Sequence, residues 1–223
     1  MVCGPLSKTS ELNTWSHVML LSFDPGKRLS GAALFDRPGG QLQDAALIRG
    51  QETGDVASVV WLAMIDALRE WIGGREVTWL AVEQMVIRPG MLQAAPALMH
   101  LQAVTGGVIG VYGKAGACCA LTPEQWKGQM QKRPHHTRIL SKLTTRELAV
   151  LGGLMDLDSY RAALQLDGDL PEEHNLVDAI GIGMSRAVQY ALLGDVEARK
   201  TAQQPKTRTS KTSNGMKVIH WKR

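Results

Sequence analysis

The sequence predicts an α/β fold in which a mixed five-stranded sheet is flanked by helices. Three apolar runs follow one another with short turns between them, a pattern that predicts an antiparallel meander. Further along the chain, apolar runs alternate with helical patterns, and this alternation favours parallel pairing. A closing helix with one apolar face is expected to pack onto the sheet. The chain is therefore expected to form one mixed sheet whose first three strands are antiparallel.

The first three strands are expected in the first quarter of the chain. Residues 17–23, HVMLLSF, form an apolar run that ends at an Asp-Pro-Gly turn beginning at Asp24. Second and third runs cover residues 31–35 and 43–49, and a Gly-Gly pair at 39–40 suits the hairpin between them. This arrangement places Asp24 at the end of a buried strand.

A helix and the fourth strand come next. Residues 56–72 carry apolar side chains at helical spacing, with Asp55 as the expected N-cap and a Gly-Gly pair at the end. Residues 76–82, EVTWLAV, are rich in β-branched and aromatic side chains and lead to Glu83. Glu83 is therefore the second carboxylate expected at a strand end.

The second half of the chain is expected to be mainly helical. A helix is predicted over residues 90–105, a strand over residues 107–112, and a last strand or its continuation over residues 117–121. Thr122-Pro123-Glu124 has the form of a helix start and leads into a basic stretch that we expect to be interrupted at Pro134. No structure is assigned to residues 156–169. The closing helix is expected from near Pro171 to about Leu193.

Length and composition suit one folded domain. The 223 residues allow an N-terminal extension at 1–16, a domain at 17–194 and a flexible basic tail at 195–223. The N-terminal residues do not resemble an export signal, and no stretch approaches the roughly 18 apolar residues of a membrane-spanning helix. Cys3, Cys118 and Cys119 form neither a disulfide framework nor a zinc pattern. We expect a cytoplasmic protein with reduced thiols and no membrane contact.

The positive charge of the chain is concentrated at its C-terminus. From Asp195 onward there are eight basic and two acidic residues, a net charge of +6, whereas the whole chain carries +4. A polar basic segment of this kind cannot bury enough apolar surface to fold alone, and a polyanion is its natural partner. The sequence therefore points to nucleic acid, although a tail that only aids solubility has the same composition.

Three carboxylates follow or interrupt apolar segments, namely Asp24, Glu83 and Asp178 in LVDAIGIG. An unpaired buried carboxylate is costly, so such a group is usually paired with a base, bonded to helix amides or bound to a metal. Hard divalent ions such as Mg²⁺ prefer oxygen ligands, and two of them promote phosphodiester hydrolysis. Individually, Asp24 could be a turn residue, Glu83 could pair with Arg88, and Asp178 could lie on a polar helix stripe.

The segments around these carboxylates resemble the RuvC-type Holliday-junction resolvases of the ribonuclease-H-like superfamily, particularly divergent phage-like members. LLSFDPGKRLSGAALF resembles the opening strand and Asp-Pro-Gly turn of that family. LAVEQMVIRPG resembles its strand ending in a metal-binding Glu, and HNLVDAIGIGMSRA resembles its closing helix with the last metal-binding Asp. The resemblance spans about Val18 to Ala187.

The resemblance implies a nuclease domain in which Asp24, Glu83 and Asp178 bind two Mg²⁺ or Mn²⁺ ions. It also implies branched DNA as the substrate and a role in recombination, and symmetric nicking of two strands implies a homodimer. The family usually places a fourth Asp or His three residues before the last Asp, where this chain has Asn175. We expect the preceding His174 to take that place as ligand or proton carrier, because both residues can share a helix face with Asp178. A histidine that merely begins a helix is the alternative.

The stretch TPEQWKGQMQKRPHHTRI is expected to contact the phosphate backbone, because basic residues near an aromatic ring suit that role. Our predicted DNA contacts, with Lys127 favoured, are Lys127, Lys132, Arg133, His136 and Arg138. Trp126 is either a base-stacking platform or the core anchor of a short helix. The pair His135-His136 lacks a third ligand at zinc spacing.

Two other classes of function remain open. The same fold supports nucleases that act on RNA-DNA hybrids, flaps or single strands, so fold does not decide the substrate. A non-catalytic DNA-binding or packaging protein could also keep the fold with purely structural carboxylates.

Overall fold

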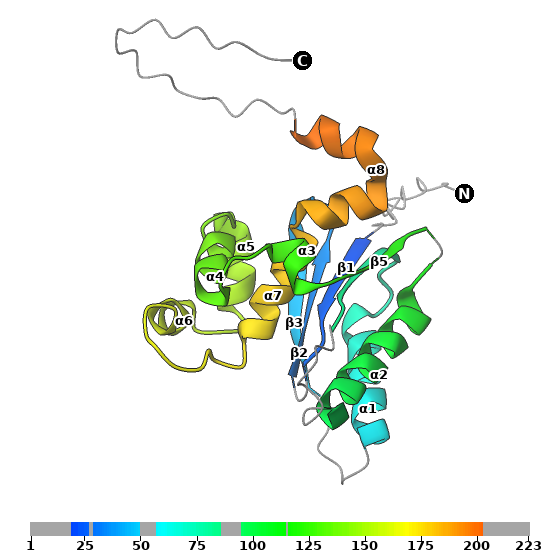
Figure 1. Cartoon of the computed structure of the whole chain (residues 1–223), viewed down its shortest axis with the longest axis horizontal. Coiled ribbons are helices and arrows are strands. Elements are labelled where there is room, and N and C mark those ends of the chain that lie inside the picture. The colour runs from blue at the N-terminus through cyan, green and yellow to red at the C-terminus, as the bar shows by residue number, and fades with distance from the viewer. Residues whose placement is uncertain (1–18, 27–28, 50–56, 86–94, 115, 203–223) are drawn as a thin grey trace, which may run out of the picture.

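A five-stranded mixed sheet lies at the centre of the protein, which we describe from a computed structural model covering residues 19–26, 29–49, 57–85, 95–114 and 116–202 (Figure 1). The strand order is β3-β2-β1-β4-β5. The strands are β1 (Met19–Asp24), β2 (Leu29–Phe35), β3 (Leu42–Arg49), β4 (Val77–Glu83) and β5 (Cys118–Leu121). The first three are antiparallel, while β1 pairs with β4 and β4 with β5 in parallel. The predicted mixed sheet is confirmed.

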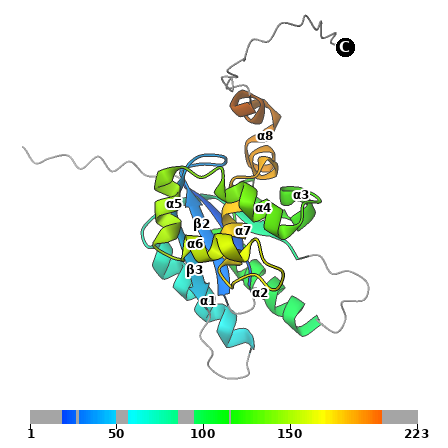
Figure 2. The ribbon, with the colours of Figure 1, turned by 90° about the vertical axis from the view of Figure 1, so that its left-hand side faces the viewer.

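Helices cover both faces of the sheet. On one face lie α1 (Ala57–Ile72) and α2 (Ala95–Tyr112), and on the other lies α7 (His174–Gly183), as Figures 1 and 2 show. The smaller helices, which surround α7, are α3 (Pro123–Lys127), α4 (Lys132–Leu140), α5 (Thr145–Gly152) and α6 (Leu157–Ala163). Because both faces are covered, successive residues of β1 are buried: Leu20 packs in the α7 layer and Leu21 in the α1 and α2 layer.

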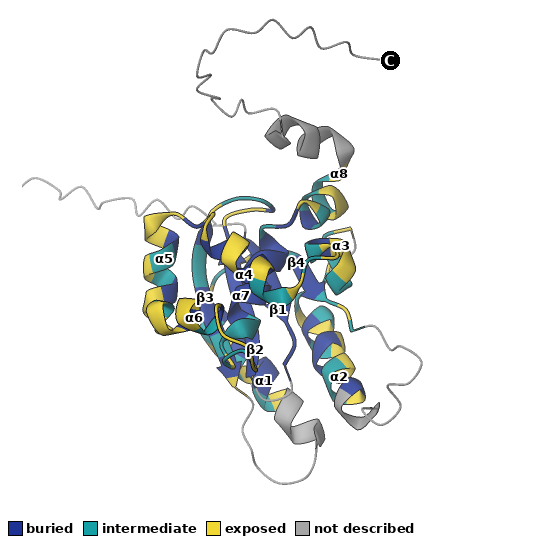
Figure 3. Ribbon diagram, turned by 60° about the vertical axis from the view of Figure 1, so that its left-hand side comes forward, coloured by how far each residue is buried: buried dark blue, intermediate teal, exposed yellow. Residues whose placement is uncertain are grey.

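Helix α7 is the most buried helix and approaches the sheet closely (Figure 3). A Cβ atom at Gly31 on β2 would lie 1.9 Å from the backbone oxygen of Asn175. At the other end of α7, a Cβ atom at Gly183 would lie 2.1 Å from the ring of Phe35. Side chains at these two positions would push the helix away from the sheet. The two glycines therefore allow α7 to bring Asp178 down to the strand ends.

The prediction of a strand at residues 107–112 was wrong, because these residues form the last turns of α2. Their β-branched side chains suggested a strand, but the buried residues of α2 include Leu98, Val104 and Val108, which recur at helical spacing. Val104 and Val108 join the core between α1, α2 and the sheet. Burial against that layer decided the conformation over local propensity. The last strand expected at 117–121 is confirmed as β5.

Pro134 does not interrupt the basic stretch as expected. It lies in the first turn of α4, where its missing N–H would have no intrahelical partner. The break falls instead between Lys127 and Lys132, and α3 begins at Pro123 as predicted. Residues 156–169, to which no structure was assigned, contain α6, whose N-cap Asp156 accepts two backbone N–H groups.

The single closing helix expected from Pro171 to Leu193 is two helices. Helix α7 ends at Gly183, and α8 (Arg186–Ala202) continues after a bend of 43°. The Ser185 hydroxyl accepts the backbone N–H of Val188 and so begins the new helix. A second break follows at Gly194, with φ at 71°.

The predicted tail begins at the Gly194 break, and α8 carries its backbone on as far as Ala202 (Figure 2). Residues 203–223, the N-terminal extension and the proposed N-cap Asp55 lie outside the described residues, as does Cys3. Cys118 and Cys119 are free thiols, as expected. Over the described ranges no single helix is long and apolar enough to cross a membrane; the bent pair α7 and α8 passes that test by length and composition only.

Candidate active site

Asp24 and Glu83 end two neighbouring parallel strands. Phe23 of β1 pairs with Val82 of β4, so the next residues, Asp24 and Glu83, emerge at the same edge of the sheet. Asp24 is only 5% exposed, and no described residue hydrogen-bonds to its carboxylate. The parallel pairing of β1 with β4 thus joins two carboxylates that are far apart in the sequence.

Trp126 holds the Glu83 carboxylate in place. Its indole N–H donates to Oε2 of Glu83 at 2.8 Å, and its ring is buried between α3 and α7. Trp126 is therefore the anchor of α3 rather than an exposed stacking platform. The alternative pairing of Glu83 with Arg88 concerns a residue outside the described ranges.

Asp178 lies on α7, the helix that covers the face of the sheet opposite α1 and α2, and its carboxylate has two partners. Lys132 Nζ lies 2.8 Å from Oδ2, and His136 Nε2 lies 2.8 Å from Oδ1. The Tyr160 hydroxyl lies 2.9 Å from Nδ1 of His136. Asp178 and its partners come from α7, α4 and α6, so together with Trp126 of α3 the site gathers side chains from four helices and two strands.

The three carboxylates influence one another electrostatically. Burial, followed by the negative charges of Glu83 and Asp178, raises the pKa of Asp24 well above its ordinary value. Burial also raises the pKa of Glu83, although the Trp126 hydrogen bond opposes this shift. Burial alone would raise the pKa of Asp178 too, but His136 and Lys132 lower it below the ordinary value. Asp178 is therefore the carboxylate whose charge the protein compensates, and the other two are held in an environment that disfavours their charge.

The chemistry of this donor set fits a hard divalent cation. Buried carboxylates that raise one another's pKa call for a positive partner, and oxygen donors are the ligands Mg²⁺ prefers. Lys127 and Lys132 supply positive charge near Asp24 and Glu83. Within the described part of the chain, however, no three His, Cys, Asp or Glu side chains are grouped so that they could hold a metal ion. The side-chain oxygens of Asp178 instead contact Lys132 and His136.

The two candidates for the fourth position take different places. Asn175 donates its amide N–H to the backbone oxygen of Leu29, which ties α7 to β2. The Nδ1–H of His174 donates to the Pro171 carbonyl at 2.9 Å, which leaves Nε2 of a neutral imidazole with its lone pair. Burial, and next the charge of Lys132, lowers the pKa of His174 and favours that neutral form. Of the two, His174 is the residue with a nitrogen suited to a metal.

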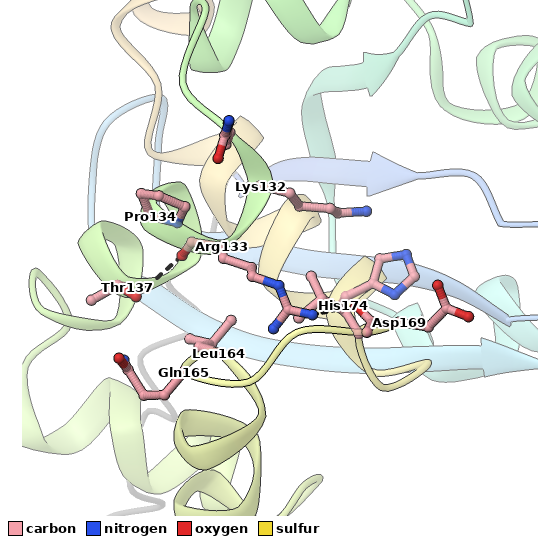
Figure 4. A pocket seen from close by; sticks show the side chains of 11 residues that line it. Lys132, Arg133, Pro134, Thr137, Leu164, Gln165, Asp169 and His174 are labelled. Atoms are coloured by element: carbon pink, nitrogen blue, oxygen red, sulfur yellow. Dashed lines mark hydrogen bonds between the residues drawn. The ribbon is translucent and has the colours of Figure 1, made fainter.

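His174 and Lys132 line one side of a pocket of about 720 Å³ between α4, the loop after α6 and the start of α7 (Figure 4). Arg133 crosses this pocket, and its guanidinium donates to the backbone oxygens of Ala163 and Gly168. Arg133 was predicted to contact DNA, but these hydrogen bonds give it a structural role in fixing the loop after α6.

His136 must be removed from the predicted DNA contacts. The residue has no exposed surface, because α4 turns it inward onto Asp178 and Tyr160. A buried imidazole cannot reach a phosphate. His136 could not be distinguished from its neighbours on the basic stretch by sequence alone, since the direction of each side chain depends on where α4 begins.

Lys127 and Arg138 meet at a second, basic pocket of about 460 Å³ beside α3, α4 and the start of α8. Lys127 Nζ lies 5.6 Å from the centre of the Trp126 ring, and the Arg138 guanidinium contacts Nδ1 of His135 at 3.1 Å. Lys142 and Arg186 also line this pocket, and none of its lining residues is acidic. Lys142, four residues after Arg138 in the connection between α4 and α5, was not among the predicted contacts, and Arg186 was absent from them because α8 follows far later in the chain.

Known proteins resemble this chain in structure but not detectably in sequence. No family model matches, and no curated protein matches in sequence. The RuvC structure of Thermus thermophilus superposes with a TM-score of 0.50 and 17% identity, covering 79% of this chain and 97% of that one. The T. thermophilus RuvC in complex with a Holliday-junction substrate gives 0.47, 17% identity and the same coverage. The yeast mitochondrial Holliday junction resolvase Ydc2 gives 0.43 and 10% identity, covering 83% of this chain and 86% of that one.

The sheet order, the pairing of its strands and the helix that carries Asp178 agree with the resemblance found in the sequence. Together with the superposition on RuvC, they show that the chain has a RuvC-like, ribonuclease-H-like fold.

Proposed function

We propose that the protein is a metal-dependent endonuclease that hydrolyses phosphodiester bonds in branched DNA, as a Holliday-junction resolvase does. The observation that supports this most strongly is that Asp24 and Glu83 end neighbouring parallel strands, near enough to Asp178 for the charges of Glu83 and Asp178 to raise the pKa of Asp24. The structural neighbours add support, since they are named RuvC and a Holliday junction resolvase.

Asp24, Glu83 and Asp178 would hold two Mg²⁺ or Mn²⁺ ions, with Nε2 of His174 as a fourth donor. When bound, such ions lower the pKa of a water molecule and neutralise the departing 3′ oxygen. The chain supplies the geometry: Asp24 and Glu83 are fixed by their strands, and Trp126 orients Glu83. Burial of Asp24 keeps water from screening these charges.

Lys132 would exchange partners as metal and substrate arrive. Its ammonium now contacts Asp178, yet its side chain is 37% exposed and can swing outward. Once released from Asp178, Lys132 would be free to contact the scissile phosphate. Lys127 also lies near these carboxylates, because its charge lowers the pKa of both Asp24 and Glu83.

The DNA strand would continue from this edge across the basic pocket. Arg138 and Arg186 line that pocket together with Lys127. Arg186 begins α8, so the pocket leads towards the basic tail. Symmetric nicking of a junction further requires two active sites, which we propose are supplied by a homodimer.

Cleavage of a synthetic four-way junction in Mg²⁺ and Mn²⁺ tests the proposal, beside linear duplex, RNA-DNA hybrid and single-stranded DNA. The variants are Asp24→Asn and the control Asp66→Asn, an exposed acidic residue of α1. We expect paired nicks in the junction from the wild type and from Asp66→Asn, and none from Asp24→Asn.

Two other outcomes would change the proposed function. Cleavage of another substrate, still abolished by Asp24→Asn, would keep the active site but discard the branched-DNA preference. Binding of DNA without cleavage of any substrate in either metal would favour the non-catalytic class.

A further inference from the structure

The two oxygens of Asp178 have partners of very different character. Oδ2 contacts Lys132, a long side chain that is 37% exposed. Oδ1 contacts His136, which has no exposed surface and is held in turn by Tyr160, itself only 2% exposed. The His136 and Tyr160 rings also stack, with centroids 6.2 Å apart. The lysine can leave its oxygen, whereas the histidine is fixed.

The direction of each hydrogen bond follows from the charge of Asp178. The Lys132 ammonium can only donate, so Asp178 faces it as a carboxylate that accepts hydrogen bonds. Oδ1 then accepts a hydrogen bond from Nε2 of His136. In the tautomer whose one ring proton is on Nε2, Nδ1 accepts the O–H of Tyr160. Burial raises the pKa of Tyr160, which keeps that proton on the phenol.

We propose that Tyr160 and His136 are positioning residues for the metal ligand Asp178. Tyr160 selects the His136 tautomer with its proton on Nε2. His136 uses that proton to anchor Oδ1, and Oδ2 is thereby presented to the metal site, where Lys132 occupies it until an ion arrives. Neither residue touches substrate. The inference rests on the proposed function and extends it to α6, a helix that contributes no other group to the site described above.

The arrangement follows the usual logic of groups that surround a metal ligand. Hydrogen-bond partners behind the ligands fix orientation, and their removal typically lowers metal affinity about 10–100-fold. Here the partner is His136, which holds Oδ1 of Asp178. Without it, the Asp178 carboxylate could rotate about its Cβ–Cγ bond. A truncated His136 would leave Oδ1 without its donor and allow both oxygens to turn.

The test uses the full-length protein without DNA and Mn²⁺ as the probe. Isothermal titration measures Mn²⁺ affinity, and ¹⁵N spectra of labelled histidine identify which ring nitrogen of His136 carries the proton. The main variant is Tyr160→Phe, which keeps the ring and removes only the hydroxyl. Its control is Tyr190→Phe, an exposed tyrosine on α8.

We expect Tyr160→Phe to lose the single tautomer and to bind Mn²⁺ about 10-fold more weakly, while Tyr190→Phe matches the wild type. A second pair of variants guards against misfolding. His136→Gln retains an N–H donor and should bind Mn²⁺ more tightly than His136→Leu. Because glutamine has no tautomer to select, adding Tyr160→Phe to His136→Gln should cause no further loss.

The outcomes separate this inference from the function on which it rests. If the wild type binds Mn²⁺ and Tyr160→Phe binds it equally well with the same tautomer, the positioning role is overturned and the nuclease proposal stands. Equal affinities for His136→Gln and His136→Leu would overturn the role of the N–H donor. If the wild type binds no Mn²⁺ at all, the metal-dependent function fails, and this inference fails with it.

Discussion

Asp24 should make the metal-free protein less stable than it would be with a neutral side chain at that position. Asp24 is only 5% exposed, and its carboxylate lies near the charges of Glu83 and Asp178. An active site that awaits a cation carries this cost in its empty form. Asp24→Asn keeps the size of the side chain and removes the charge, so it isolates the electrostatic penalty.

The expected gain is on the order of 1–3 kcal/mol, the usual scale of the desolvation cost of a buried polar group. For a chain of this length, that gain corresponds to a rise in Tm of roughly 2–12 °C. The raised pKa of Asp24 determines how this stability penalty depends on pH. Below the ordinary pKa of 3.8 the group is protonated in both states and no penalty exists. The penalty grows as the pH rises from there and is complete above the raised pKa of the folded state.

The assay is thermal unfolding in EDTA of the wild type, Asp24→Asn and the exposed control Asp66→Asn, at about pH 8 and about pH 5. Asp24→Asn should have the higher Tm at the higher pH, and the difference should shrink at the lower pH. Mg²⁺ should then raise the Tm of the wild type more than that of Asp24→Asn. A lower Tm for Asp24→Asn in EDTA at about pH 8 would refute the reasoning, because it would mean that the carboxylate has stabilising partners.

Three further predictions concern the surroundings of the site. Trp126→Phe removes the donor that lowers the pKa of Glu83, so the rising limb of the cleavage rate against pH should move to higher pH, and an unmoved limb would contradict this role. Gly31→Ala places a Cβ atom against the backbone of α7 and should cost about 1–3 kcal/mol or more in urea unfolding, whereas Gly74→Ala, with open space around it, should cost far less. Truncation after Gly194 should weaken DNA binding and flatten its dependence on salt concentration; an unchanged slope would show that the tail makes no phosphate contacts.

Much of the fold could be predicted because local patterns and chain order constrain it strongly. Apolar runs with short turns determined the meander, and the alternation after Gly73 determined the parallel pairing of β4 with β1. Residues 107–112 were misread since β-branched residues suit a strand and a buried helix alike. Only the layer against which Val108 packs distinguishes the two. The bend between α7 and α8 was missed for a similar reason, because apolar periodicity continues across it.

The carboxylates of the candidate site could be identified from the sequence, but their partners could not. Asp24, Glu83 and Asp178 stand out because an acidic residue in an apolar segment is rare and costly. His136 and Tyr160 give no such signal, since a histidine in a basic stretch and a tyrosine in an irregular one are both ordinary. Their roles depend on which way α4 and α6 face Asp178.

The sequence by itself determined the strand ends, the order of the carboxylates and the basic character of the segments that follow them. These features depend on residues close together in the chain, whose polarity and periodicity are visible directly. The tertiary structure alone decided which cation contacts Asp178, that Arg133 holds the loop after α6, that His136 faces inward, and that Arg186 joins Lys127 at one pocket. Such contacts join elements that are far apart in the chain. They depend on how each helix is rotated about its axis, because neighbouring residues of a helix can face solvent and core respectively.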